Sequence, residues 1–129
     1  MDLVIGTEGA CEKVVTDADT AIAHKSGTLE VFATPALAAL MEQTAQESIA
    51  NQLDEGFTTV GTSLELQHLA PTPVGATVQC KSTLTEQDRK SLTFQLVATD
   101  EVGEIGRATH KRFIVEAAKF QAKANTRRA

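Results

Sequence analysis

Hydrophobic and polar positions along the chain follow two periods, one before and one after Gly56. From about Pro35 to about Leu53, apolar residues recur every three to four positions, which predicts an amphipathic helix. The stripe expected to face the core consists of Leu37, Leu40, Met41 and Thr44. Thr34 is the expected N-cap and Pro35 the first helical residue, and Gly56 is available as the left-handed C-cap.

After Gly56 the alternation has a period of two, which is typical of strands with one buried face. Four alternating segments are separated by short turns rich in polar residues, and together they predict antiparallel hairpins. The segments are 59–70, 76–86, 91–100 and 105–117. In the first of them, strict alternation places Val60, Thr62, Leu64, Leu66 and His68 on one face. One more short strand is expected before the helix, around Glu12 to Thr16.

One long helix and one antiparallel sheet give an α+β fold of a single domain covering residues 1–129. A helix of this length measures roughly 28 Å at about 1.5 Å per residue, so it would cross most of the sheet, which wraps around it. The sheet keeps two edges, and pairing of two edges predicts a homodimer. The basic tail, from about residue 119 to residue 129, is expected to fray.

Composition excludes several classes of function. The net charge is −5 and the pI is near 5.1, so nucleic-acid binding has no electrostatic support. Aromatic residues amount to five Phe, without Trp or Tyr, which also disfavours a base-stacking platform. Cys11 and Cys80 lack metal-ligand spacing and are expected to be free thiols. Neither a membrane span nor a secretory leader is recognisable, which predicts a soluble cytoplasmic protein.

Two residues break the pattern of the predicted core. Glu42 lies on the shoulder of the apolar helix stripe, and His68 continues the apolar face of a strand. Each has an ordinary structural explanation: the carboxylate could be solvated or paired with a residue of the sheet, and the imidazole could bond to backbone. A partly desolvated imidazole can also titrate near neutral pH, which makes His68 the strongest candidate for chemistry.

Three segments taken together resemble a known family. EVFATPALAALME, VGTSLELQHLAPTPVGATV and ATHKRFIV are similar to the hotdog-fold acyl-CoA thioesterases, specifically the fluoroacetyl-CoA thioesterase-like group. In that group a Thr before the helix, a Glu eight residues later and a His on the following strand form the catalytic set. The matching residues are Thr34, Glu42 and His68. The resemblance implies a hotdog homodimer, or a tetramer, that hydrolyses acyl-CoA to a carboxylic acid and CoA without metal or other cofactor.

The resemblance also implies roles. Glu42 attacks the thioester carbonyl or activates water, two alternatives that stay open, while His68 moves protons and stabilises the departing CoA sulfur. Thr34 positions the reacting groups, and the backbone N–H of Gly61 serves the oxyanion. These four residues are expected around one cavity between subunits, with Thr34 and Glu42 facing His68 of the other chain. Binding of the CoA phosphates is assigned to Arg112, Lys111 and Arg89.

Two other functions remain as alternatives: a non-catalytic acyl-CoA binding dimer and a hotdog enoyl-thioester hydratase. The chain also departs from the fluoroacetyl-specific pattern. Thr28 and Leu29 stand before the helix where that enzyme carries aromatic lid residues, and Pro35 replaces a Gly. Discrimination in favour of fluoroacetyl-CoA is therefore not expected, and the acyl group is left open.

Overall fold

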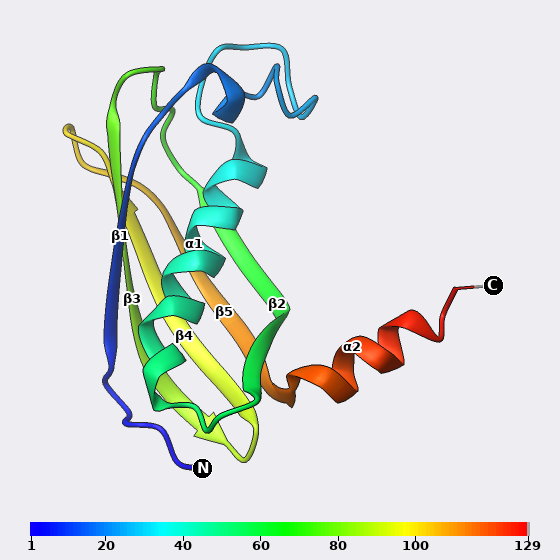
Figure 1. The fold of residues 1–129 in the computed structure, drawn as a ribbon. Coiled ribbons are helices and arrows are strands. Elements are labelled where there is room, and N and C mark those ends of the chain that lie inside the picture. The colour runs from blue at the N-terminus through cyan, green and yellow to red at the C-terminus, as the bar shows by residue number, and fades with distance from the viewer. Residues whose placement is uncertain (129) are drawn as a thin grey trace.

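The computed structural model describes residues 1–128 and shows one antiparallel sheet curled around one long helix (Figure 1). The strands are β1 (Glu8–Val14), β2 (Phe57–His68), β3 (Thr77–Asp88), β4 (Ser91–Thr99) and β5 (Glu104–Glu116). The helices are α1 (Thr34–Ile49) and α2 (Ala117–Asn125), with short 3-10 turns at Asp17–Asp19 and Ala50–Gln52. The spatial order is β1-β3-β4-β5-β2, so β1 and β2 are the edges.

The core lies between α1 and the sheet, as the periodicities predict. The predicted stripe of α1 is buried, and Ala45 and Ile49 extend it. Facing it are the inward positions of the sheet: Val78, Cys80, Leu84, Leu92, Phe94, Leu96, Ala98 and Ile114. Removing this apolar surface from water is the main force that holds the helix on the sheet.

The strict alternation predicted along β2 is wrong in its first half, because the pairing of β2 with β5 shifts register between Gly61 and Ser63. An extra residue of this kind exchanges the two faces of a strand. Before the shift, Thr59 is the buried residue, whereas after it Leu64, Leu66 and His68 are the more buried positions. The irregularity therefore brings Gly61 to the face that α1 covers, although simple alternation places it on the opposite side from His68.

The helix begins and ends earlier than predicted. Its N-cap is Ala33, so Thr34 is the first helical residue and Pro35 the second, and the Thr34 side chain does not cap the helix. The α-helix ends at Ile49, followed by the 3-10 turn. Gly56, with φ of +86°, belongs to the turn that leads into β2 and does not cap the helix.

The two ends of the chain also differ from expectation. β1 lies a few residues earlier than the predicted strand around Glu12 to Thr16 and pairs with β3, which sets Cys11 opposite Cys80 as free thiols. Residues Ala117–Asn125 form helix α2, which was not predicted. The fraying expected from about residue 119 to residue 129 stays a prediction, and residue 129 lies outside the described residues. This helix projects beyond the β2 edge of the sheet, and all its residues are exposed (Figure 1).

Candidate active site

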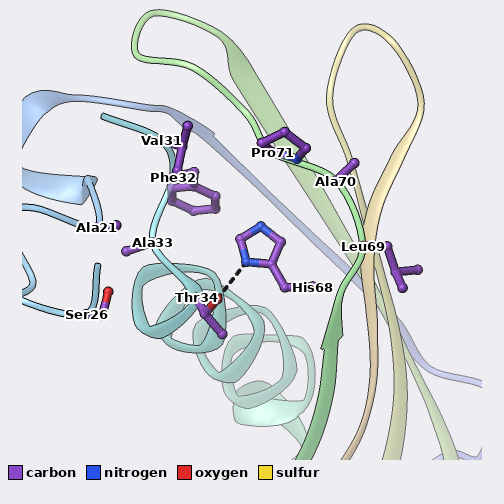
Figure 2. Close-up of a pocket in the computed structure, with 10 residues that line it drawn as sticks. All are labelled: Ala21, Ser26, Val31, Phe32, Ala33, Thr34, His68, Leu69, Ala70 and Pro71. Carbon is purple, nitrogen blue, oxygen red and sulfur yellow. Dashed lines mark hydrogen bonds between the residues drawn. The ribbon is translucent and has the colours of Figure 1, made fainter. Parts of the chain in front are cut away.

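Thr34 and His68 meet where α1 begins and β2 ends. Thr34 Oγ1 and His68 Nδ1 are 2.8 Å apart, a hydrogen bond between two side chains of the same protomer. The pair lies in a pocket of about 290 Å³ whose other walls are mainly apolar (Figure 2). These walls come from Phe32 and Ala33 before the helix, and from Leu69, Ala70 and Pro71 after the strand.

The second ring nitrogen of His68 is not satisfied by the protein. Nε2 is buried and has no hydrogen-bond partner among residues 1–128. Figure 2 shows this nitrogen on the far side of the ring from Thr34, toward Phe32 and Pro71. Burial lowers the pKa of His68, an effect that the backbone of Ala70 opposes. A neutral imidazole with one nitrogen held and the other free is arranged to accept or donate a proton.

Glu42 lies two turns further along α1, in a second polar cluster. Its Oε2 is 3.3 Å from Arg112 Nη1, and its side chain is 46% exposed. The same oxygen lies against Gly61, so closely that a Cβ at position 61 would overlap it. Gly61 therefore makes room for the carboxylate on the covered face of β2.

His110 and Arg112 support Glu42 from β5. His110 Nδ1 lies 2.7 Å from the carbonyl oxygen of Ser63, and because a carbonyl can only accept, this nitrogen carries the proton. His110 Nε2 is then free to accept from Arg112 Nη1 at 3.1 Å. Burial is the largest effect that lowers the pKa of His110, and the Arg112 charge adds to it. His110 is thus a neutral acceptor that orients the guanidinium.

The remaining nitrogens of Arg112 are held by Thr59. Nε donates to Thr59 Oγ1 at 2.8 Å and Nη2 donates to the Thr59 carbonyl at 3.0 Å. Burial lowers the pKa of Arg112, and the carboxylate of Glu42 opposes that shift. Four of the five N–H donors of Arg112 are engaged, and only 7% of the residue is exposed. In this structure Arg112 therefore contacts Glu42, and its assignment to a CoA phosphate stays a prediction.

The four predicted site residues form two clusters within one protomer. Thr34 joins His68, and Glu42 joins Gly61. Eight residues of α-helix separate Thr34 from Glu42, about 12 Å along the axis at about 1.5 Å per residue. The expectation that Thr34 faces His68 of another chain is wrong, since the two are bonded within one chain. Both clusters lie where α1 faces the edge strand β2, because Thr34 and Glu42 belong to α1 and His68 and Gly61 belong to β2.

The other two predicted phosphate ligands lie elsewhere. Lys111 is exposed next to Arg112 in β5, so its side chain points to the opposite face of the sheet. Arg89 occupies the β3–β4 turn with φ of 58°, at the end of the sheet away from Thr34 and His68. Thr59 and His110, which hold Arg112, were not predicted as site residues. His110 and Arg112 lie two positions apart on the inward face of β5, which is otherwise apolar. This pair of polar residues on an apolar face could have indicated a role for His110.

Residues 1–128 contain no group of three or more His, Cys, Asp or Glu side chains that could hold a metal ion. Nor is any helix there long and apolar enough to span a membrane.

A five-stranded antiparallel sheet curled around one long helix is the architecture of the hotdog thioesterases. The solved structures agree. The fluoroacetyl-CoA thioesterase FlK superposes with a TM-score of 0.94 at 29% identity, over 100% of both chains. A thioesterase superfamily member from Thermus thermophilus gives 0.89 at 25% identity, over 97% of this chain and 93% of the other.

The sequence comparisons identify the family. The model of the fluoroacetyl-CoA-specific thioesterase family matches residues 15–118. The fluoroacetyl-CoA thioesterase of Streptantibioticus cattleyicolor is 37% identical over 94 residues, which are 73% of this chain and 68% of that protein. The chain belongs to the fluoroacetyl-CoA-specific thioesterase family, and its resemblance to the hotdog thioesterases is confirmed.

Proposed function

We propose that this protein is an acyl-CoA thioesterase whose active site combines Thr34 and His68 of one subunit with Glu42 and Gly61 of a second subunit. Thioester hydrolysis follows from family membership. The observation that carries the site assignment is the His68 ring, with one nitrogen bonded to Thr34 and the other buried, unpartnered and in a pocket.

A homodimer would unite the two clusters. β2 is an edge strand of 12 residues, and its outer backbone groups are free to pair with another strand. Antiparallel pairing with a second β2 runs the end of one strand alongside the start of the other. A register that sets Gly61 opposite His68 of the partner subunit brings Glu42 to the partner's Thr34–His68 pair. Such a C2 interface builds two identical sites.

The chemistry then divides between the subunits. The thioester carbonyl lies in the apolar pocket. Glu42 either removes a proton from the water that attacks the carbonyl, or attacks the carbonyl itself and forms an anhydride that water then hydrolyses to the carboxylic acid. The backbone N–H of Gly61 is the proposed donor to the oxyanion. His68, held by Thr34, gives a proton to the departing CoA sulfur. The proposal needs no cofactor beyond the CoA of the substrate, and the predicted cytoplasmic location stays a prediction.

The test is release of free thiol by the purified protein from a panel of acyl-CoA thioesters that differ in chain length and in α-substitution, fluoroacetyl-CoA and acetyl-CoA among them. Turnover of at least one member that is lost in His68→Ala supports the proposal. Binding of these compounds without thiol release would instead favour the acyl-CoA binding dimer. Without the aromatic lid residues, fluoroacetyl-CoA should have no large advantage over acetyl-CoA.

A further inference from the structure

The chain has only two cysteines, and the fold sets them opposite each other. Cys11 of β1 and Cys80 of β3 are far apart in the sequence, yet they are direct partners in the antiparallel pairing of the two strands. Opposed residues of such a pair point to the same face of the sheet, with Cα atoms about 4.5–5.5 Å apart. The Cα atoms of a disulfide are about 4.4–6.8 Å apart, so this backbone spacing suits one.

The two sulfurs differ in their surroundings. Cys80 is 0% exposed, and burial raises the pKa of its thiol, an effect that the side chain of Thr44 opposes. Cys11 is only half-buried, and its Sγ lies 3.7 Å from Glu47 Oε1 in an exposed contact between β1 and α1. Because access and ionisation control the reactivity of a thiol, Cys11 is the sulfur that meets an oxidant first. Cys80 is the second, internal thiol.

The position of β1 allows the two sulfurs to come together. The Cβ atoms of opposed residues are about 4.5–5.5 Å apart, whereas those of a disulfide are about 3.8 Å apart. β1 must therefore approach β3 by about 1 Å at Cys11. β1 is an edge strand that pairs with β3 alone, so no other strand has to move with it (Figure 1).

We propose that Cys11 and Cys80 form an oxidation site that takes a hydroperoxide as its oxidant and closes to a disulfide that fastens β1 to β3. The Cys11 thiolate attacks a peroxide oxygen, the O–O bond breaks, and the sulfur becomes a sulfenic acid. The departing oxygen takes up a proton and leaves as an alcohol, or as water if the oxidant is hydrogen peroxide. The Cys80 sulfur then attacks the Cys11 sulfur, the S–O bond breaks, and the hydroxyl leaves as water with the Cys80 proton. Two thiols are oxidised to one disulfide and one peroxide is reduced.

The disulfide changes stability and not the proposed active site. Neither cysteine lines the pocket that holds Thr34 and His68. The cross-link encloses the whole of α1 and β2, and a disulfide that closes a long loop restricts the unfolded chain strongly. Oxidised protein should therefore resist unfolding more than reduced protein. This inference goes beyond the proposed function and does not depend on thioester hydrolysis.

The test exposes the fully reduced, full-length protein to hydrogen peroxide and follows free thiols, intact mass and a non-reducing peptide map. The wild type should lose both thiols together and yield one pair of peptides joined through Cys11 and Cys80, and dithiothreitol should reverse this. Cys80→Ala should stop at a Cys11 sulfenic acid that dimedone traps. Cys11→Ala should keep Cys80 reduced, because that thiol is buried.

Urea unfolding measures the fastening of β1. Oxidation should lower the unfolding equilibrium constant of the wild type about ten-fold or more, within the range for a disulfide. Peroxide should not change it in Cys11→Ala, the matched control, which retains both methionines and so corrects for their oxidation. Two intact thiols after a treatment that fully oxidises free cysteine in a parallel sample would overturn the inference. A disulfide between the Cys11 residues of two chains, or an oxidised form no more stable than the reduced one, would overturn it equally.

Discussion

At the scale of single residues, the arrangement depends on the contact between Glu42 and Gly61. The carboxylate oxygen occupies the space that a side chain at position 61 would need. Its partner Arg112 is itself fixed by Thr59 and His110, so the carboxylate cannot easily move aside while keeping that contact. Position 61 therefore controls where Glu42 points.

Gly61→Ala should displace the Glu42 carboxylate and lower kcat, with little effect on the free energy of unfolding because β2 accepts alanine. The measurement is steady-state kinetics together with urea unfolding. Gln67→Ala, an exposed position further along the same strand, is the control for a β2 substitution in general. A fully active Gly61→Ala enzyme would show that the position of Glu42 does not matter to the reaction.

Glu42→Gln preserves the size and helix packing of the side chain but removes its charge. If Glu42 is the nucleophile or the base, kcat should fall by at least about 100-fold, the lower range for a positioned base. The loss should appear in kcat more than in KM, because the interaction is realised mainly in the transition state. Near-normal kcat with a lowered Tm would reduce Glu42 to a structural partner of Arg112.

The sequence indicated these residues through pattern and resemblance, but not their grouping. Glu42 and His68 were recognisable as polar exceptions on apolar faces. His68 bonds to Thr34, whereas Glu42 bonds to Arg112. This pairing depends on how far α1 is shifted along β2, and no local sequence pattern specifies that shift. Arg112 looked like an ordinary strand charge because its buried partner Thr59 lies 53 positions away in the chain.

At the scale of elements, the register shift in β2 shapes the site. It turns Thr59 and Gly61 toward α1 in the first half of the strand and His68 in the second half. One strand thus supplies residues to both clusters on the same side of the sheet. The alternation of apolar residues predicted the existence and order of the strands, yet an irregularity that inserts one residue leaves little trace in hydrophobicity alone.

Arg112 of β5 bonds to Glu42 of α1 and to Thr59 of β2, so its replacement should lower the free energy of unfolding. Arg112→Met leaves the Thr59 hydroxyl and carbonyl without their donor, which should lower the free energy of unfolding by about 1–3 kcal/mol. kcat should fall because Glu42 loses its anchor, while KM for acyl-CoA should change little. Urea unfolding and steady-state kinetics measure both; a large rise in KM with unchanged stability would place Arg112 at the CoA phosphates instead.

At the scale of the whole molecule, the half-buried His68 and the buried His110 link stability to pH. The folded-state pKa values of His68 and His110 both lie below the usual 6.5, mainly because of burial. Below pH 6.5 the unfolded chain therefore binds protons that the folded chain does not, so the free energy of unfolding should fall as pH drops from 7 toward 5. Urea unfolding across this range should show the fall, and His68→Gln and His110→Gln should each reduce it. A constant stability from pH 7 to pH 5 would contradict the assigned burial.

The fold as a whole was predictable, because a change of period from helical to alternating leaves few ways to bury one apolar stripe and one apolar face. The assembly was predictable only in outline, since a free edge indicates pairing without fixing its register. The proposed pairing of two β2 strands makes each active site a joint product of two subunits. The sharing of each active site between two subunits is the central claim.

The most direct test mixes two inactive variants, His68→Ala and Glu42→Gln, after unfolding and refolding them together. If Thr34 and His68 act with Glu42 of the partner subunit, each mixed dimer contains one site with both substitutions and one intact site. Random assembly should then restore about a quarter of the wild-type thiol release, since half of the dimers are mixed and each has one working site. A mixture that stays as inactive as either variant alone, although sedimentation confirms mixed dimers, would contradict a shared site.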